Sequence, residues 1–267
     1  MEKVIRNSKK ITQQAWDENA CFWDEKMGEG NDFFNFLEWP SILRLLNPKP
    51  GQSVLDIATG NGLIARKLAA LEVNVDAIDF SEKLLGIAEA KPNPGGRINY
   101  YNLDVTNERK LLSLGTHKFD SAICNMALFD ISDIFPIFTT LPHLLKPSGI
   151  FVFTITHPAF NNASCTHMVE EIDEGGKLRT VYSIKISNYM SPTQTFGIAM
   201  RTQPKPHIYF DRPLEDYLHP GFENGFVLDG FEENAFPSSY IPSSLLSWGG
   251  NFSEIPPVLA IRMRLNK

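Results

Sequence analysis

The chain has 267 residues, which suits one large domain or one domain with a substantial insertion, because single hydrophobic cores stop growing at about 250–300 residues. Hydrophobic residues make up 43% of the chain, aromatic residues 11% and charged residues 21%, and this composition excludes intrinsic disorder and a coiled coil. The net charge is −6 and lysine and arginine form no dense run, so nucleic acid is not an expected partner.

Cellular location and metal content are predicted from two further features. The longest apolar stretch, around residues 149–155, is far shorter than the about 20 residues that a membrane helix needs. The cysteines Cys21, Cys124 and Cys165 are odd in number and widely spaced, which indicates neither a disulfide framework nor a zinc site. We therefore expect a cytoplasmic protein without membrane insertion, with reduced thiols and no metal.

The first 50 residues predict an N-terminal helical cap. They are rich in aromatic side chains, among them Trp16, Phe22 and Trp23, and end in a helical pattern of isoleucine and leucine before a proline-glycine turn.

From residue 51 to residue 267, short apolar runs alternate with helical stretches, which predicts a doubly wound α/β domain with a mostly parallel sheet. Helices are expected near residues 64–71, 131–145 and 213–224, together with one that Ser81 caps and that carries Leu84, Leu85 and Ala88. Two late runs are expected to form an antiparallel edge pair, so that the sheet has seven strands. The expected strands cover residues 53–58, 73–79, 97–102, 119–125, 150–156, 226–233 and 258–265.

Residues 159–210 break this rhythm and are predicted to be an insertion after the fifth strand. Alternating residues around Tyr182 predict a strand of a small added sheet. Binding specificity in α/β folds often depends on loops added to the sheet, so the insertion is expected to be a lid over the acceptor or a dimer surface.

The most informative segment is an apolar strand that ends in Asp56 and leads into a turn with Gly60 and Gly62. Glycines allow the backbone to approach a ligand without a Cβ clash, and the next helix start favours negative or polar groups. Gly60, Gly62 and Ala65 also satisfy the dinucleotide fingerprint, with Asp79 available for a ribose. Asp56 decides between these readings, because a carboxylate there suits an ammonium or sulfonium better than paired phosphates.

This segment resembles the class I methyltransferases that use S-adenosylmethionine, particularly the small-molecule type related to ubiquinone-biosynthesis methyltransferases. Asp56, Gly60 and Gly62 match the family's first motif, and Ala58 replaces its first glycine. The resemblance extends over about residues 54–155 and implies a Rossmann-like fold.

Further landmarks of the family follow in order along the chain. The resemblance implies that Asp79 binds the ribose hydroxyls, that Phe80 flanks the adenine and that Asp104 accepts a hydrogen bond from the adenine amino group. Each acid alone also suits a turn or a helix cap, but all three follow parallel strands at the sheet edge that binds ligands. The cofactor residues expected for S-adenosylmethionine are Asp56, Ala58, Thr59, Gly60, Gly62, Asp79, Phe80, Asp104, Val105, Asn125 and, from the cap, Trp23.

The acceptor side carries weaker signals. His157 follows the fifth strand and is either a base or positioning group, or a histidine that only hydrogen-bonds in a loop. The other histidines, at positions 117, 143, 167, 207 and 219, are expected to face solvent mostly. Asp130 and Asp133 are interpreted as charges at a helix start rather than as metal ligands.

The sequence thus predicts in-line methyl transfer from S-adenosylmethionine to an oxygen or nitrogen, less readily a carbon, of a small-molecule acceptor. Two alternatives stay open: an NAD(P)-dependent oxidoreductase of Rossmann type, and a donor-binding module without turnover. The protein is expected to be a monomer or a homodimer.

Overall fold

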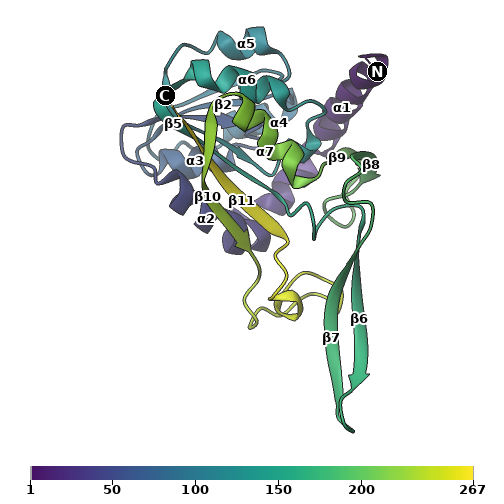
Figure 1. Cartoon of the computed structure of the whole chain (residues 1–267). Helices are drawn as coiled ribbons and strands as arrows, with labels where there is room; N and C mark the ends of the chain where they lie inside the picture. The colour runs from purple at the N-terminus through teal and green to yellow at the C-terminus, as the bar shows by residue number, and fades with distance from the viewer. Residues whose placement is uncertain (1, 267) are drawn as a thin grey trace.

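The computed structural model describes residues 2–266, with side chains from residue 8 onward, so Met1 and Lys267 at the outer ends of the predicted segments lie outside it. A seven-stranded sheet in the order β10-β11-β5-β4-β1-β2-β3 forms its centre, between two layers of helices (Figure 1). The strands are β1 (Ser53–Ile57), β2 (Asn74–Asp79), β3 (Ile98–Asn102), β4 (Phe119–Asn125), β5 (Leu145–Thr156), β10 (Phe226–Asn234) and β11 (Val258–Leu265).

The strand directions confirm the predicted fold class. Strands β1 to β5 pair in parallel, whereas β11 is antiparallel to both β5 and β10. The chain moves outward from β1 to β3 and then returns to place β4 on the other side of β1. The carboxyl ends of β1 and β4 therefore lie at a topological switch point, where open α/β sheets bind their ligands.

Helices and short helical turns connect these strands. Their bounds are α1 (Glu2–Met27), η1 (Phe34–Glu38), α2 (Trp39–Leu46), α3 (Leu63–Ala69), α4 (Glu82–Ala90), α5 (Glu108–Leu112), η2 (Leu128–Asp130), α6 (Phe135–Leu144), α7 (Leu214–Glu223) and η3 (Gly250–Phe252). Helix α1 and the segment around α2 come before β1 in the chain. Helices α2 and α3 pack on one face of the sheet and α6 packs on the other, whereas η3 contacts β7 (Leu178–Ile186).

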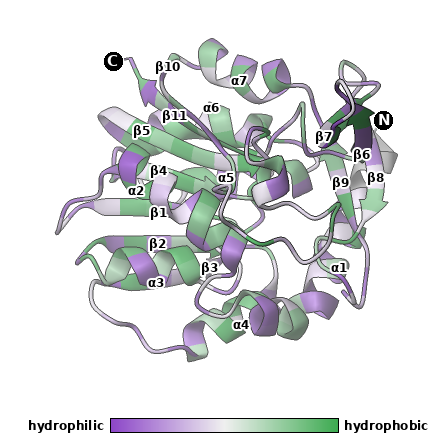
Figure 2. Cartoon of the chain, turned by 90° about the horizontal axis from the view of Figure 1, so that it is seen from below, coloured by the Kyte–Doolittle hydropathy of each residue, from purple (hydrophilic) through white to green (hydrophobic). Residues whose placement is uncertain are grey.

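The sheet is buried on both faces, which explains why its central strands are apolar throughout. Leu55 and Phe153 belong to the core under α6, whereas Val54 and Val152 belong to the core under α2 and α3. Neighbouring residues of a strand point to opposite faces, so each central strand contributes to both cores. Figure 2 accordingly shows the central strands as mainly hydrophobic.

Two hairpins occupy most of the predicted insertion, and one of them projects far from the body of the molecule (Figure 1). The projecting hairpin consists of β6 (Cys165–Asp173) and β7 (Leu178–Ile186), and it contains the strand predicted around Tyr182. The second hairpin, β8 (Thr193–Gly197) with β9 (His207–Asp211), was not predicted and lies beside α1.

Several predicted boundaries were wrong. The sequence predicts a helical cap over the first 50 residues but not the bounds of α1 within it. The helix expected over residues 131–145 is shorter and begins at Phe135, whose backbone N–H donates to Asp133 Oδ1 at 3.1 Å. A one-turn 3-10 helix, η2, comes before it.

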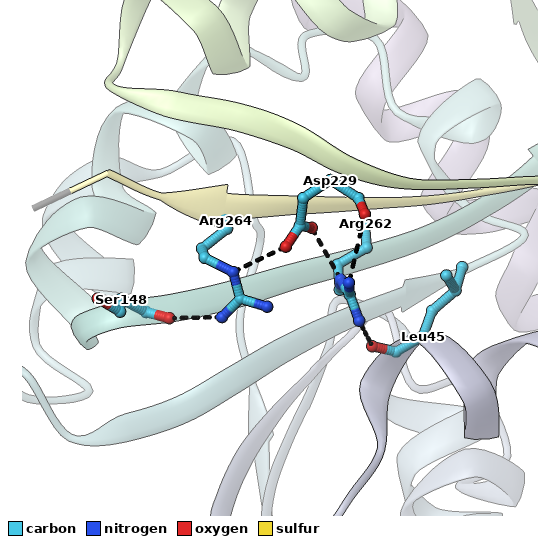
Figure 3. Close-up of polar contacts among 5 residues, drawn as sticks. All are labelled: Leu45, Ser148, Asp229, Arg262 and Arg264. Carbon is cyan, nitrogen blue, oxygen red and sulfur yellow. Dashed lines mark hydrogen bonds and ion pairs between the residues drawn. The ribbon is translucent and has the colours of Figure 1, made fainter.

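The antiparallel edge is tied together by Asp229, which lies at an irregularity of β10 (Figure 3). Its carboxylate accepts hydrogen bonds from Arg262 Nε and Arg264 Nε, both at 2.7 Å. Arg262 also donates to the Leu45 carbonyl at 3.0 Å, and Arg264 donates to the Ser148 carbonyl at 3.2 Å. The edge strands are thereby joined to α2 and to the start of β5.

Two absences hold for the described part of the chain. None of its helices is both long and apolar enough to cross a membrane. No group of three or more histidine, cysteine, aspartate or glutamate side chains in it is arranged to hold a metal ion.

Candidate active site

A cavity of about 720 Å³ lies at the carboxyl ends of the parallel strands. Its walls include the loops after β1, β2, β3 and β4, together with residues of α1, β8 and β9. This volume is typical of a pocket for a small molecule or cofactor.

Helix α1 lies across the ends of three strands and closes one side of this cavity. Asp24 accepts a hydrogen bond from Asn61 in the turn after β1, at 2.8 Å. Gln13 donates to the Phe80 carbonyl after β2 at 2.8 Å, and Lys9 hydrogen-bonds Thr106 after β3. The predicted cap is therefore anchored to each loop that reaches the cavity from this half of the sheet.

The turn after β1 has three residues in the left-handed region: Ala58 (φ 56°), Gly60 (φ 57°) and Gly62 (φ 74°). A Cβ on Gly60 would meet no atom within 4 Å, and Gly60 lines the cavity. A Cβ on Gly62 would lie 2.7 Å from Tyr100 Oη and 2.9 Å from the Ala88 side chain. Gly60 thus keeps space open for a ligand, whereas Gly62 permits close packing behind the turn.

Asp56 is buried and holds the turn in place. Its carboxylate accepts a hydrogen bond from Thr59 Oγ1 at 2.6 Å and another from the Ala65 backbone N–H. Burial raises the pKa of Asp56 to about 7, and the nearby Asp79 carboxylate adds to this shift. Asp56 and Thr59 both line the cavity, and their predicted contact with the cofactor stays a prediction.

Asp79 at the end of β2 joins two loops. Its carboxylate accepts hydrogen bonds from the backbone N–H groups of Gly60 at 2.8 Å and Ser81 at 2.9 Å. Burial raises its pKa to about 6, although these backbone bonds favour the ionised form. Asp79 therefore positions the glycine turn as well as lining the cavity.

The charge of the lining is strongly biased. The lining residues within the described chain include six with carboxyl groups and one lysine, Lys9, but no arginine. Such a wall suits a positively charged ligand better than a pyrophosphate. The acidic lining residues are Glu38, Asp56, Asp79, Asp104, Asp130 and Asp211.

Comparison with known proteins agrees with this geometry. A model of the methyltransferase domain matches residues 54–149. An S-adenosylmethionine-dependent methyltransferase from Mesorhizobium loti is 25% identical with a TM-score of 0.63, covering 85% of this chain and 97% of that one. A putative one from Listeria monocytogenes is 18% identical with a TM-score of 0.62, covering 86% and 98%.

Curated relatives match over a shorter range. The ubiquinone biosynthesis O-methyltransferase of Dechloromonas aromatica is 31% identical over 39% of this chain and 45% of that protein. That of Thiobacillus denitrificans is 29% identical over 58% of this chain and 63% of that protein. These matches span less than two thirds of either relative. Residues 54–149 are a class I methyltransferase domain.

S-adenosylmethionine is the cofactor of this domain class, and the residues of the methyltransferase domain fit it. The open space at Gly60 and the acidic lining both accommodate a bulky cationic ligand. The other cofactor residues named from the sequence lie around the same cavity, apart from Gly62, which packs behind the turn. Those that line it are Trp23, Ala58, Phe80, Asp104, Val105 and Asn125.

Asp104 and Asn125 already form hydrogen bonds with other side chains and the backbone of this chain. Asp104 Oδ1 accepts hydrogen bonds from the Thr106 backbone N–H at 2.8 Å and from Thr106 Oγ1 at 2.7 Å. Asn125 Nδ2 donates to Glu38 Oε2 at 2.9 Å, and Asn125 Oδ1 accepts from Thr154 Oγ1 at 2.5 Å. Burial raises the pKa of Glu38 to about 7. Glu38 was missed from the sequence because it lies in the cap without a motif.

His157 is not among the residues that line the cavity of the methyltransferase domain. Its Nε2 lies 3.0 Å from Glu233 Oε1, and its Nδ1 accepts a hydrogen bond from the Ala159 backbone N–H at 3.1 Å. Burial lowers its pKa despite the Glu233 carboxylate. This geometry favours the loop role over the base role, which stays a prediction from sequence.

The prediction that His207 faces solvent was wrong. Asp130 lies in the first turn of a short helix, η2, as interpreted, but it is also buried. His207 is only 1% exposed and Asp130 only 9%, and both line the cavity. An available signal was overlooked: His207, Tyr209 and Asp211 alternate with apolar residues along β9, and all three line the cavity.

Proposed function

We propose that the protein transfers the methyl group of S-adenosylmethionine in line to an oxygen or nitrogen, less readily a carbon, of a small-molecule acceptor. The observation that carries this proposal is the acidic cavity at the switch point of a methyltransferase fold. Such a displacement needs chiefly alignment of nucleophile, methyl carbon and sulfur in a pocket with little water. The curated relatives are named as O-methyltransferases, which supports a small acceptor.

The cavity also bears on the two alternatives. A nicotinamide dinucleotide carries two phosphates, which favour cationic partners. The lysine of the described lining, Lys9, already hydrogen-bonds Thr106, and this disfavours the oxidoreductase alternative. A binding module without turnover would keep the donor site but lack groups able to engage an acceptor. We propose further that the protein acts in the cytoplasm, which its free cysteines support, and that it is a monomer or homodimer.

The test is titration calorimetry with S-adenosylhomocysteine, S-adenosylmethionine and NAD, followed by a search for methylated products by mass spectrometry. We expect both adenosyl compounds to bind and NAD not to bind. Binding of NAD without binding of S-adenosylhomocysteine would identify an oxidoreductase instead. Donor binding without methyl transfer across a broad acceptor panel would identify a binding module.

Asp79→Ala tests the assigned ribose contact. Hydrogen bonds to a charged group contribute about 1.5–3 kcal/mol, so S-adenosylhomocysteine affinity is expected to fall by roughly tenfold to a hundredfold. Asp76→Ala is the matched control, because Asp76 is a buried carboxylate of the same strand that does not line the cavity. An affinity within threefold of wild type for Asp79→Ala, with the fold intact, would remove the ribose assignment.

A further inference from the structure

Four buried polar atoms of residues that line the cavity lack hydrogen-bond partners among the described residues: Thr12 Oγ1, Ser132 Oγ, His207 Nε2 on β9 and Asp130 Oδ1 at the end of η2. The last two form a donor and acceptor pair. They lie 3.6 Å apart, which is too far for a direct hydrogen bond. Buried polar groups are normally paired, and unpaired ones carry an energetic cost. This pair can therefore bind a ligand group that completes its hydrogen bonds.

The tautomer of His207 follows from its neighbour Gln203. The side-chain oxygen of Gln203 accepts a hydrogen bond from the Ala199 backbone N–H at 3.1 Å, and its nitrogen donates to the Lys205 carbonyl at 2.7 Å. These contacts orient the amide so that its nitrogen, 3.1 Å from His207 Nδ1, donates to that atom. Nδ1 is therefore an acceptor, and the neutral ring carries its proton on Nε2, on the side of Asp130.

The direction of this N–H is set by packing. The ring of His207 stacks on Trp16 at 4.9 Å between centroids and 17° between planes, and Tyr209 meets it edge-on at 4.5 Å. Asn19 of α1 hydrogen-bonds the backbone of Lys205 in both directions, at 2.8 and 2.9 Å. The donor is thus held rigidly before any ligand arrives, as a preorganised site requires.

Resting on the proposed function, we infer that His207 and Asp130 together bind the hydroxyl group of the methyl acceptor, and that Asp130 takes its proton. An oxygen placed about 2.9 Å from both His207 Nε2 and Asp130 Oδ1 makes two good hydrogen bonds, accepting from His207 and donating to Asp130. This oxygen becomes bonded to the methyl carbon while the bond from carbon to sulfur breaks. The electron pair of that bond stays on sulfur, and the hydroxyl proton goes to Asp130.

This geometry favours oxygen over nitrogen as the attacking atom. A hydroxyl oxygen has two lone pairs, so one accepts from His207 while the other attacks the methyl group. A neutral amine has a single lone pair, which the same hydrogen bond would occupy. The pair of His207 and Asp130 therefore favours methylation of hydroxyl compounds over methylation of their amine analogues.

The rest of the wall near this pair defines the acceptor class. Phe129 and Ile131 flank Asp130 in the sequence, and Tyr209 contacts His207; all three line the cavity. Burial raises the pKa of Asp130 well above its usual range and lowers that of His207 to about 4. A cationic sulfonium in the cavity favours the ionised form of Asp130. We therefore expect an uncharged, largely aromatic or apolar hydroxyl compound.

The binding test uses wild-type protein with labelled histidine nitrogens, saturated with S-adenosylhomocysteine. Addition of 2-naphthol is expected to shift the Nε2 resonance of His207, whereas naphthalene, which has no oxygen to accept the His207 N–H, is not. His207→Phe identifies the resonance by its absence. Binding of S-adenosylhomocysteine without any response to hydroxyl compounds would overturn this inference while leaving the proposed function intact. A failure to bind S-adenosylhomocysteine would instead refute the proposed function.

The kinetic test measures methylation of phenol, catechol and 2-naphthol by product mass spectrometry. Asp130→Asn is expected to lower kcat by about a hundredfold or more, the usual contribution of a general base, with S-adenosylhomocysteine affinity within threefold of wild type. Asp133→Asn is the matched control, because Asp133 is exposed and lies outside the cavity lining, and its kcat is expected to stay within threefold. A kcat of Asp130→Asn within threefold of wild type would refute the role of Asp130.

The contribution of His207 is tested by two variants. His207→Phe keeps an aromatic ring against Trp16 but removes the donor, and kcat/KM for the hydroxyl acceptor is expected to fall at least about tenfold. His207→Gln keeps an N–H donor and is expected to restore part of this loss. Equal activity of the two variants would show that His207 only fills space.

Discussion

The two glycines of the turn after β1 differ in what an added methyl group would meet, and alanine substitutions separate their roles. Gly60→Ala adds a Cβ in open space beside the cavity, so its cost to folding is the left-handed backbone alone, about 1–2 kcal/mol. Gly62→Ala has the same backbone cost and also places its Cβ 2.7 Å from Tyr100 Oη and 2.9 Å from the Ala88 side chain. Such overpacking costs a further 1–3 kcal/mol or so, for a total of about 2–5 kcal/mol.

Urea denaturation followed by circular dichroism measures this difference, and calorimetry with S-adenosylhomocysteine measures the effect on binding. We expect Gly62→Ala to be less stable than Gly60→Ala by at least about 1 kcal/mol. We expect the opposite order for binding, with at least a tenfold loss of affinity for Gly60→Ala, because its methyl group takes up ligand space. Equal stability of the two variants, or unchanged affinity for Gly60→Ala, would refute this division of roles.

Two further predictions concern the same turn. Ala58 has a left-handed backbone (φ 56°), so Ala58→Gly removes a strain of about 1–2 kcal/mol and loses less than about 1 kcal/mol through the freer unfolded chain. A rise in the thermal midpoint is expected, and a fall would show that the Ala58 methyl group packs favourably. The second concerns Asp56, whose pKa is about 7 in the fold and about 3.9 in an unfolded chain, so the folded protein binds more protons in between. Its contribution to stability is fully present below about pH 4 and is lost as pH rises through 7. The urea midpoint should therefore fall more steeply between pH 5 and pH 8 for the wild type than for Asp56→Asn. Parallel curves for the two proteins would contradict this.

Much of the sheet was predictable because its signals are local. A strand buried on both faces needs apolar residues throughout, and a strand in contact with helices ends where glycine, proline or a capping side chain occurs. Ser81 shows this well, since its Oγ accepts from the Leu84 backbone N–H at 3.2 Å at the predicted start of α4.

The acceptor side was less predictable, because its residues act through contacts between distant segments. His207 and Asp130 are 77 positions apart and have no shared motif, yet β9 and η2 bring their polar atoms to 3.6 Å. The position of α1 across the cavity was not predictable for the same reason, since its hydrogen bonds go to loops after three different strands.

The sequence by itself determined the parallel sheet, its antiparallel edge and the glycine turn with Asp56 and Asp79, because periodicity and backbone freedom are properties of neighbouring residues. Only the tertiary structure decided which polar side chains outside the sequence motifs face the cavity. In the fold, His157 lies in a loop beside Glu233, outside the cavity lining, whereas His207 is buried beside Asp130. The reason is physical: the pairing of a buried polar group depends on which chain segment packs against it, and that choice is made by the whole fold.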